Sequence, residues 1–146
     1  LKANEVRIAS GNGTARDMVA AGELAACLTD TDDAYAAIQD GKPVRMGIPD
    51  QGPSGAGTLL IPNTVALIKG GPNPEHARKL IDFLLSAEVE EMLASSASAQ
   101  IPVRSGVRRP AFVQPFGTIK TFPVSFDRAL EALPASSKFI QEEFLR

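Results

Sequence analysis

The sequence has very few of the residues that usually carry reactive or metal-binding chemistry. It contains one cysteine, one histidine, one tyrosine and no tryptophan among 146 residues. A single cysteine excludes an intrachain disulfide and a cysteine-based zinc site. Cys27 lies in a run of small apolar residues, which favours a core position over a nucleophile. No Cys–His arrangement points to nucleophilic catalysis.

Long apolar runs and one-sided charge are also missing. No apolar stretch reaches the length that spans a membrane. The 15 basic and 17 acidic residues are spread along the chain, and no basic block suggests a nucleic-acid partner. Hydrophobic residues make up 44% and charged residues 22%, which is the balance of a globular protein with one modest core.

Short apolar runs alternate with helical patterns along the chain, and this alternation predicts an α/β fold. The helical patterns begin at Thr14, at Asp30 or Thr31, at Asn73-Pro74 and at Ser125, and the last is interrupted at Pro134. Glycines at 22 and 41 are expected to stop the first two helices. The predicted strands are residues 6–8, 24–28, 44–48, 59–61 and 65–68.

Two polar segments fall where a strand leads into a helix, the usual place for a ligand in an open α/β sheet. Residues 10–14 (Ser-Gly-Asn-Gly-Thr) offer backbone N–H groups to an anion but lack the lysine of a P-loop. Residues 29–33 (Thr-Asp-Thr-Asp-Asp) hold oxygen ligands that suit a hard cation, without EF-hand spacing. The alternatives are an ordinary turn for the first segment and plain helix capping for the second.

A third segment, residues 49–57, is rich in glycine and proline and is either a hinge, a binding loop or a surface connection. An acid–base enzyme would use Asp32 and Asp33, with Asp50 as a further candidate. No nucleophile motif or aromatic platform accompanies these carboxylates. We therefore assign no catalytic residue and expect that the chain is not an enzyme.

Four phrases in the sequence resemble those of periplasmic solute-binding proteins of ABC importers. Gly22-Glu23-Leu24 before an apolar run resembles the start of a strand in that family, and residues 57–70 look like its crossing strand. Residues 73–86 (NPEHARKLIDFLLS) are similar to its "NPE-A-KLIDFLLS" helix, and Ile101-Pro102-Val103-Arg104 is similar to its "YPV" phrase. Within that family the chain looks most like the ferric-ion-binding proteins, and this resemblance implies the type 2 periplasmic-binding fold.

The resemblance implies a ligand site, residue by residue. Asn12 falls where iron-binding members hold a synergistic anion, and Asp30 and Thr31 fall at a second polar pair. Asp32 and Asp33 fall where those members carry two adjacent iron-binding tyrosines, and Tyr35 is displaced by two positions. The implied ligand-binding set is Asn12, Asp30, Thr31, Asp32, Asp33 and Tyr35. Asp32 and Asp33 are candidate ligands for ferric iron or another hard metal ion, although the missing tyrosine pair leaves a metal complex, another cation or an organic solute open.

The resemblance also implies that the chain is the C-terminal half of a two-lobed protein, because family members are about twice as long. Residues 1–60 would belong to the second lobe, residues 61–112 to the first, and residues 113–146 to the second again. The expected partners are a solute and the permease subunits of an importer. The expected location is periplasmic or extracellular, with a membrane anchor on the outer face in a Gram-positive cell. A sensor domain of the same fold and self-association of the chain remain alternatives.

Overall fold

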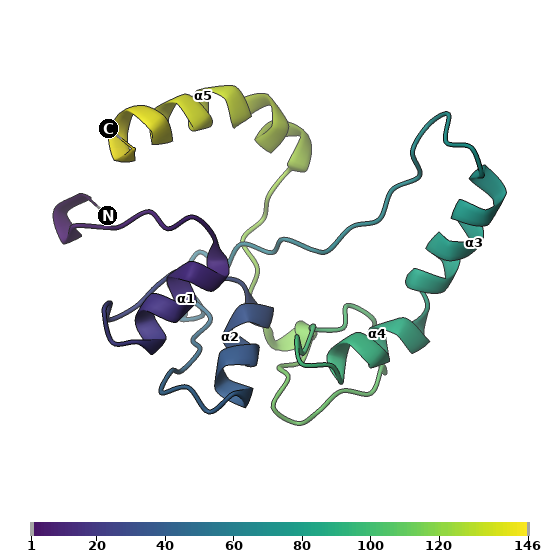
Figure 1. Ribbon diagram of the computed structural model, residues 1–146, viewed down its shortest axis with the longest axis horizontal. Coiled ribbons are helices and arrows are strands. Elements are labelled where there is room, and N and C mark those ends of the chain that lie inside the picture. Colours follow the sequence, from purple (N-terminus) through teal and green to yellow (C-terminus); the bar gives the residue numbers. More distant parts are fainter. Residues whose placement is uncertain (1, 146) are drawn as a thin grey trace.

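The structure is a computed structural model that describes residues 2–145. Leu1 and Arg146, which end the predicted lobe segments 1–60 and 113–146, lie outside the described residues. Helices are separated by long extended segments (Figure 1). The α-helices are α1 (Asn12–Ala20), α2 (Thr31–Gln39), α3 (Pro74–Leu84), α4 (Ala87–Ala94) and α5 (Phe126–Phe144), and the short 3-10 turns are η1 (Lys2–Asn4) and η2 (Phe116–Thr118).

The predicted strands are not formed, so the α/β class is not confirmed by this structure. Within residues 2–145 the only β-type pairing is an isolated parallel bridge between Thr58 and Thr121. The five predicted strand segments are present as irregular chain instead. A strand forms only when a neighbouring strand satisfies its backbone N–H and C=O groups, and among residues 2–145 these segments have no paired strand beside them.

The helices begin close to the predicted positions. Asp30 is the N-cap of α2, and its side chain accepts a hydrogen bond from the backbone N–H of Asp33. Pro74 occupies the first turn of α3, as the Asn-Pro pair predicts. The first helix starts two residues earlier than expected, at Asn12, so Thr14 is not its cap. The predicted interruption at Pro134 is wrong, because Pro134 lies inside a continuous α5.

Glycines end the first two helices, as predicted. Gly22 has a φ of 77° and Gly41 a φ of 71°, and both values lie in the left-handed region that favours glycine after a helix. The apolar pattern from 74 to 93 is divided at Ser86, whose hydroxyl accepts a hydrogen bond from the Val89 N–H at 3.3 Å. This cap starts α4 and separates it from α3.

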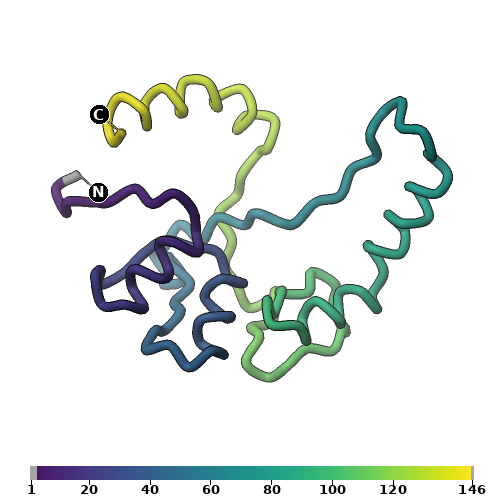
Figure 2. The backbone as a smooth tube through the Cα atoms, viewed as in Figure 1, coloured from purple at the N-terminus to yellow at the C-terminus, as the bar shows by residue number. Residues whose placement is uncertain are grey.

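The helices form an open arrangement with a small core. Helix α1 packs against α2, and α3 contacts α4, while α3 lies at the end of a long extended segment and α5 at the end of another (Figure 2). Tyr35, Ala99 and Val113 form the buried cluster, with Met46 and Ile101 packed against it. Most large apolar side chains outside this cluster are exposed.

The loop over residues 49–57 is attached to Lys120. The Gln51 side chain donates to the Lys120 carbonyl at 2.9 Å and accepts from the Lys120 N–H at 2.7 Å. The Lys120 ammonium donates to the carbonyl of Gly52 at 3.2 Å and also to that of Gly55. Sequence reasoning identified the loop but gave no sign of this lysine. The three-part division of the chain at 60 and 112 stays a prediction.

Candidate functional site

The N-terminal ends of α1 and α2 lie together and bring several of the predicted ligand residues into contact. The Asn12 side-chain amide donates a hydrogen bond to the carboxylate of Asp30. The Thr29 hydroxyl donates to the Asn12 carbonyl at 3.4 Å. These contacts join residues 18 and 17 positions apart in the sequence. The resemblance placed Asn12 and Asp30 in one site, and they are neighbours here.

Arg16 is the main residue of this region that sequence reasoning missed. Its guanidinium forms an ion pair with Asp33 at 2.8 Å, and the side chains of both residues are largely covered. It also pairs with Asp17 at 2.9 Å. Arg16 follows Asn12 by four positions, so the two share one face of α1 and project toward α2. That spacing was the available signal. We call Asn12, Arg16, Asp30, Asp32 and Asp33 the α1–α2 polar cluster.

The carboxylates of this cluster differ in their acidity. Partial burial acts to raise the pKa of Asp30, but hydrogen bonds from Asn12, Asp32 and the Asp33 N–H outweigh it and leave that pKa below its usual value. Burial raises the pKa of Asp32, and the neighbouring Asp30 carboxylate raises it further. The two groups therefore share charge unequally, with Asp30 the more readily ionised of the pair.

Removal of the α2 cap should cost stability in a pH-dependent way. We expect Asp30→Ala to lower the free energy of unfolding by about 1 kcal/mol at neutral pH, since the Asp33 N–H loses its partner. The folded-state pKa of Asp30 is lowered, so its contribution is present above the unfolded value near 3.8 and is lost as pH falls through the folded-state pKa. Urea unfolding of both proteins from pH 7 to pH 3 measures this. A difference that grows in acid would contradict it.

The other two residues of the predicted ligand-binding set, Thr31 and Tyr35, lie outside the α1–α2 polar cluster. Thr31 is the first residue of α2, where it is half-buried beside the cluster. Tyr35 points away from the cluster into the core: its hydroxyl accepts a hydrogen bond from the Gln114 N–H at 3.2 Å, and its ring lies 5.9 Å from that of Phe112. The structure therefore brings Asn12, Asp30 and Asp33 together and leaves Tyr35 outside their group.

The cluster does not by itself form a metal site. Among the described residues no group of three or more histidine, cysteine, aspartate and glutamate side chains is placed to hold a metal ion. Asp33 is already neutralised by Arg16. Asp32 and Asp33 thus offer at most a partial ligand set, and a metal bound here would need further ligands.

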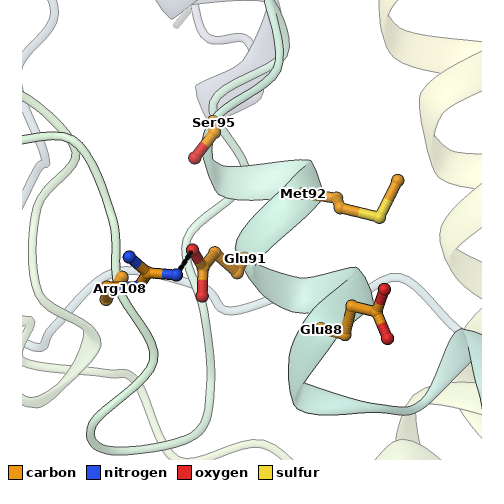
Figure 3. A pocket seen from close by; sticks show the side chains of 5 residues that line it. All are labelled: Glu88, Glu91, Met92, Ser95 and Arg108. Carbon is orange, nitrogen blue, oxygen red and sulfur yellow. Dashed lines mark ion pairs between the residues drawn. The ribbon is translucent and has the colours of Figure 1, made fainter.

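Two surface pockets of the described residues lie elsewhere. One of about 500 Å³ is lined by Tyr35, Ile38, Gln39, Met46, Phe112 and Gln114. The other, of about 350 Å³, lies between α4 and the segment that carries Arg108. Figure 3 shows Arg108 reaching Glu91, with which it pairs at 2.7 Å, while Glu88 points the other way. Neither pocket contains a predicted ligand residue other than Tyr35.

The sequence comparison defines the class of protein. The family described as bacterial extracellular solute-binding protein matches residues 1–121. The chain belongs to this family. This match confirms the resemblance to periplasmic solute-binding proteins that the sequence indicated. Membership in this family implies the periplasmic-binding fold and an extracytoplasmic location. No helix of the described residues is long and apolar enough to cross a membrane.

Individual relatives are distant and longer. The chain is 32% identical to "Iron uptake protein A1" of Synechocystis sp., over 95% of this chain and 40% of that protein. It is also 32% identical to "Putative 2-aminoethylphosphonate-binding periplasmic protein" of Salmonella typhimurium, over 73% of this chain and 32% of that protein. The chain thus spans less than half the length of these relatives. No solved structure matches it closely enough for comparison.

Proposed function

We propose that this chain is part of the extracytoplasmic solute-binding component of an ABC importer, which traps a solute between two lobes and delivers it to a membrane permease. The match to the solute-binding family over residues 1–121 carries this proposal. The contact between Asn12 and Asp30, two residues that the resemblance assigned to one site, supports it. In a Gram-positive cell the protein would be anchored on the outer face of the membrane.

The first candidate cargo is ferric iron, another hard metal ion, or a complex of one. Asp32 and Asp33 would supply carboxylate oxygens, which hard cations prefer. A facing lobe and a synergistic anion near Asn12 would complete the coordination. The iron uptake protein among the relatives favours this cargo. The ion pair between Arg16 and Asp33 weighs against it, because a cation would have to displace the guanidinium or accept its repulsion.

The second candidate cargo is a small anion such as a phosphonate. The N-cap residue of α1 is Gly11, and no side chain there satisfies the first N–H groups of the helix. Arg16 adds a positive charge one turn farther along the same helix. Backbone N–H groups and a guanidinium suit an anion, and a phosphonate-binding relative favours it. Asp30 and Asp32 would then face any amine that the solute carries.

Calorimetric titration separates these candidates. A protein of the length of the relatives should be titrated with ferric, ferrous, manganese and calcium ions, with phosphate and carbonate, and with 2-aminoethylphosphonate. Tight binding of a metal ion or of an anion supports the transport proposal and selects the cargo. Absence of binding across the whole panel, by a folded protein, would count against both cargoes.

Two other functions are less well supported. A sensor domain of the same fold would carry a DNA-binding or signalling segment on the same polypeptide. An acid–base enzyme would use the Asp32–Asp33 pair, and the solute-binding relatives favour a protein without such activity. Turnover of a substrate that is abolished by Asp32→Asn would support the enzyme.

A further inference from the structure

The loop over residues 49–57 is folded around the ammonium group of Lys120. That group donates to the carbonyls of Gly52 at 3.2 Å and Gly55, and it lies 3.5 Å from the carbonyl of Pro53. No ion pair among the described residues includes Lys120, so backbone carbonyls and not a carboxylate surround its charge. We call these three carbonyls the carbonyl cage. Carbonyl oxygens that converge on one positive charge replace the water around a monovalent cation.

The backbone of the loop builds the carbonyl cage. Asp50 has a φ of 56°, in the left-handed region that few residues other than glycine adopt. The Gly57 N–H donates to the Asp50 carbonyl at 3.1 Å and closes the loop. A Cβ atom at Gly55 would lie 2.2 Å from the Asp50 carbonyl oxygen, so the turn that brings the carbonyls together requires glycine there.

The same loop is joined to the backbone on both sides of Lys120. The Thr58 N–H donates to the Lys120 carbonyl at 2.9 Å, and the Phe122 N–H donates to the Thr58 carbonyl at 2.7 Å. A Cβ atom at Gly57 would lie 2.6 Å from the carbonyl carbon of Thr121, which shows how closely the two backbones approach. From this junction two extended segments lead to α3 and to α5 (Figure 1). An ammonium group in the carbonyl cage thus fixes the common origin of both segments.

We propose that the carbonyl cage is a binding site for one monovalent cation of the size of ammonium or potassium, and that the Lys120 ammonium is its built-in occupant. The ligands are uncharged oxygens, which favours a monovalent over a divalent ion. Lys120 is exposed, so a free ion would bind weakly at this surface. Attachment to the chain gives the ammonium group a high effective concentration there. The carbonyl cage contains no residue of the α1–α2 polar cluster, so the proposal holds whatever solute the protein binds.

Lys120→Met, which empties the carbonyl cage and keeps a side chain of similar shape, tests the proposal. In the full-length protein we expect the amides of Gly57, Thr58 and Phe122 to exchange with solvent about tenfold faster in this variant, because the junction opens more often. Ammonium or potassium chloride at molar concentration should restore the protection. Tetramethylammonium chloride at the same concentration should not, because its methyl groups cannot donate to the carbonyls. Hydrogen exchange followed by NMR measures each amide.

Two further variants serve as controls. Lys42→Met removes an exposed lysine from the turn after α2 and should change none of these exchange rates. Gln51→Ala removes the side-chain hydrogen bonds to the Lys120 backbone but keeps the ammonium group. Exchange should be faster in Gln51→Ala and should not respond to added ammonium or potassium, because the carbonyl cage is already occupied.

Three results would overturn the proposal: unchanged exchange in Lys120→Met, equal restoration by tetramethylammonium chloride, or restoration by none of the salts. A Lys120→Met protein that folds in ammonium or potassium chloride and not in tetramethylammonium chloride would support it. If this variant folds in none of them, Lys120→Gln, which keeps N–H donors without the charge, is compared in the same salts, and the same results decide.

Discussion

Asp32→Ala/Asp33→Ala is expected to weaken binding of a cationic cargo by roughly 100-fold or more in a protein of the length of the relatives. Each hydrogen bond or contact from a charged group contributes about 1.5–3 kcal/mol, and two carboxylates are removed together. Asp32 lies free of Arg16, and Asp33 lies within its reach. Calorimetry with the cargo found in the titration panel measures the change. Asp82→Ala on α3 removes a carboxylate far from the cluster along the chain and serves as the control.

Arg16→Met distinguishes a cationic cargo from an anionic one, because the two should respond to this substitution with affinity changes of opposite sign. For a cation, removal of the guanidinium eliminates repulsion and frees Asp33, so binding should tighten. For an anion, the same change removes the positive group and should weaken binding. The double aspartate variant should then leave the affinity for phosphate or carbonate equal or stronger, and should weaken binding of 2-aminoethylphosphonate, whose amine Asp32 would face. Unchanged affinity in the double variant together with unchanged affinity in Arg16→Met would remove the α1–α2 polar cluster from the ligand site.

The sequence predicted the helices well because their signals are local. Asp30 caps α2 through a contact three residues away, and Pro74 and Gly41 act through their own backbone angles. Pro134 misled the prediction, because α5 continues through it although a proline removes one backbone hydrogen bond from a helix.

The strands and the site were harder because they depend on distant parts of the chain. The run at residues 24–28 has the composition of a strand, yet Leu28 is 80% exposed. A strand forms only when it packs and pairs with a neighbouring strand, which composition alone does not reveal. Asn12 and Asp30 were linked through the resemblance alone. Arg16 was missed because a single arginine on a helix is ordinarily a solvated residue, and only the approach of α2 shows its partner Asp33.

Tyr35 was predicted to bind ligand, but it lies in the core, and the two roles predict different effects of its substitution. We expect the loss of stability to be the larger effect. Its side chain is only 5% exposed, in a chain with few other buried residues, so Tyr35→Ala should lower the free energy of unfolding by about 3–5 kcal/mol. A small domain has about 5–15 kcal/mol in total, and this loss would leave much of the chain unfolded.

Tyr35→Phe separates the two roles, because it keeps the ring against Phe112 and removes only the hydroxyl that accepts from the Gln114 N–H. We expect it to cost about 1 kcal/mol of stability, measured by urea unfolding, and to leave solute affinity unchanged. A phenylalanine variant of normal stability with binding weakened tenfold or more would instead return Tyr35 to the ligand site. In that case the ring must turn out of the core when the solute binds, and the pocket of about 500 Å³ beside it would be where the hydroxyl meets the cargo.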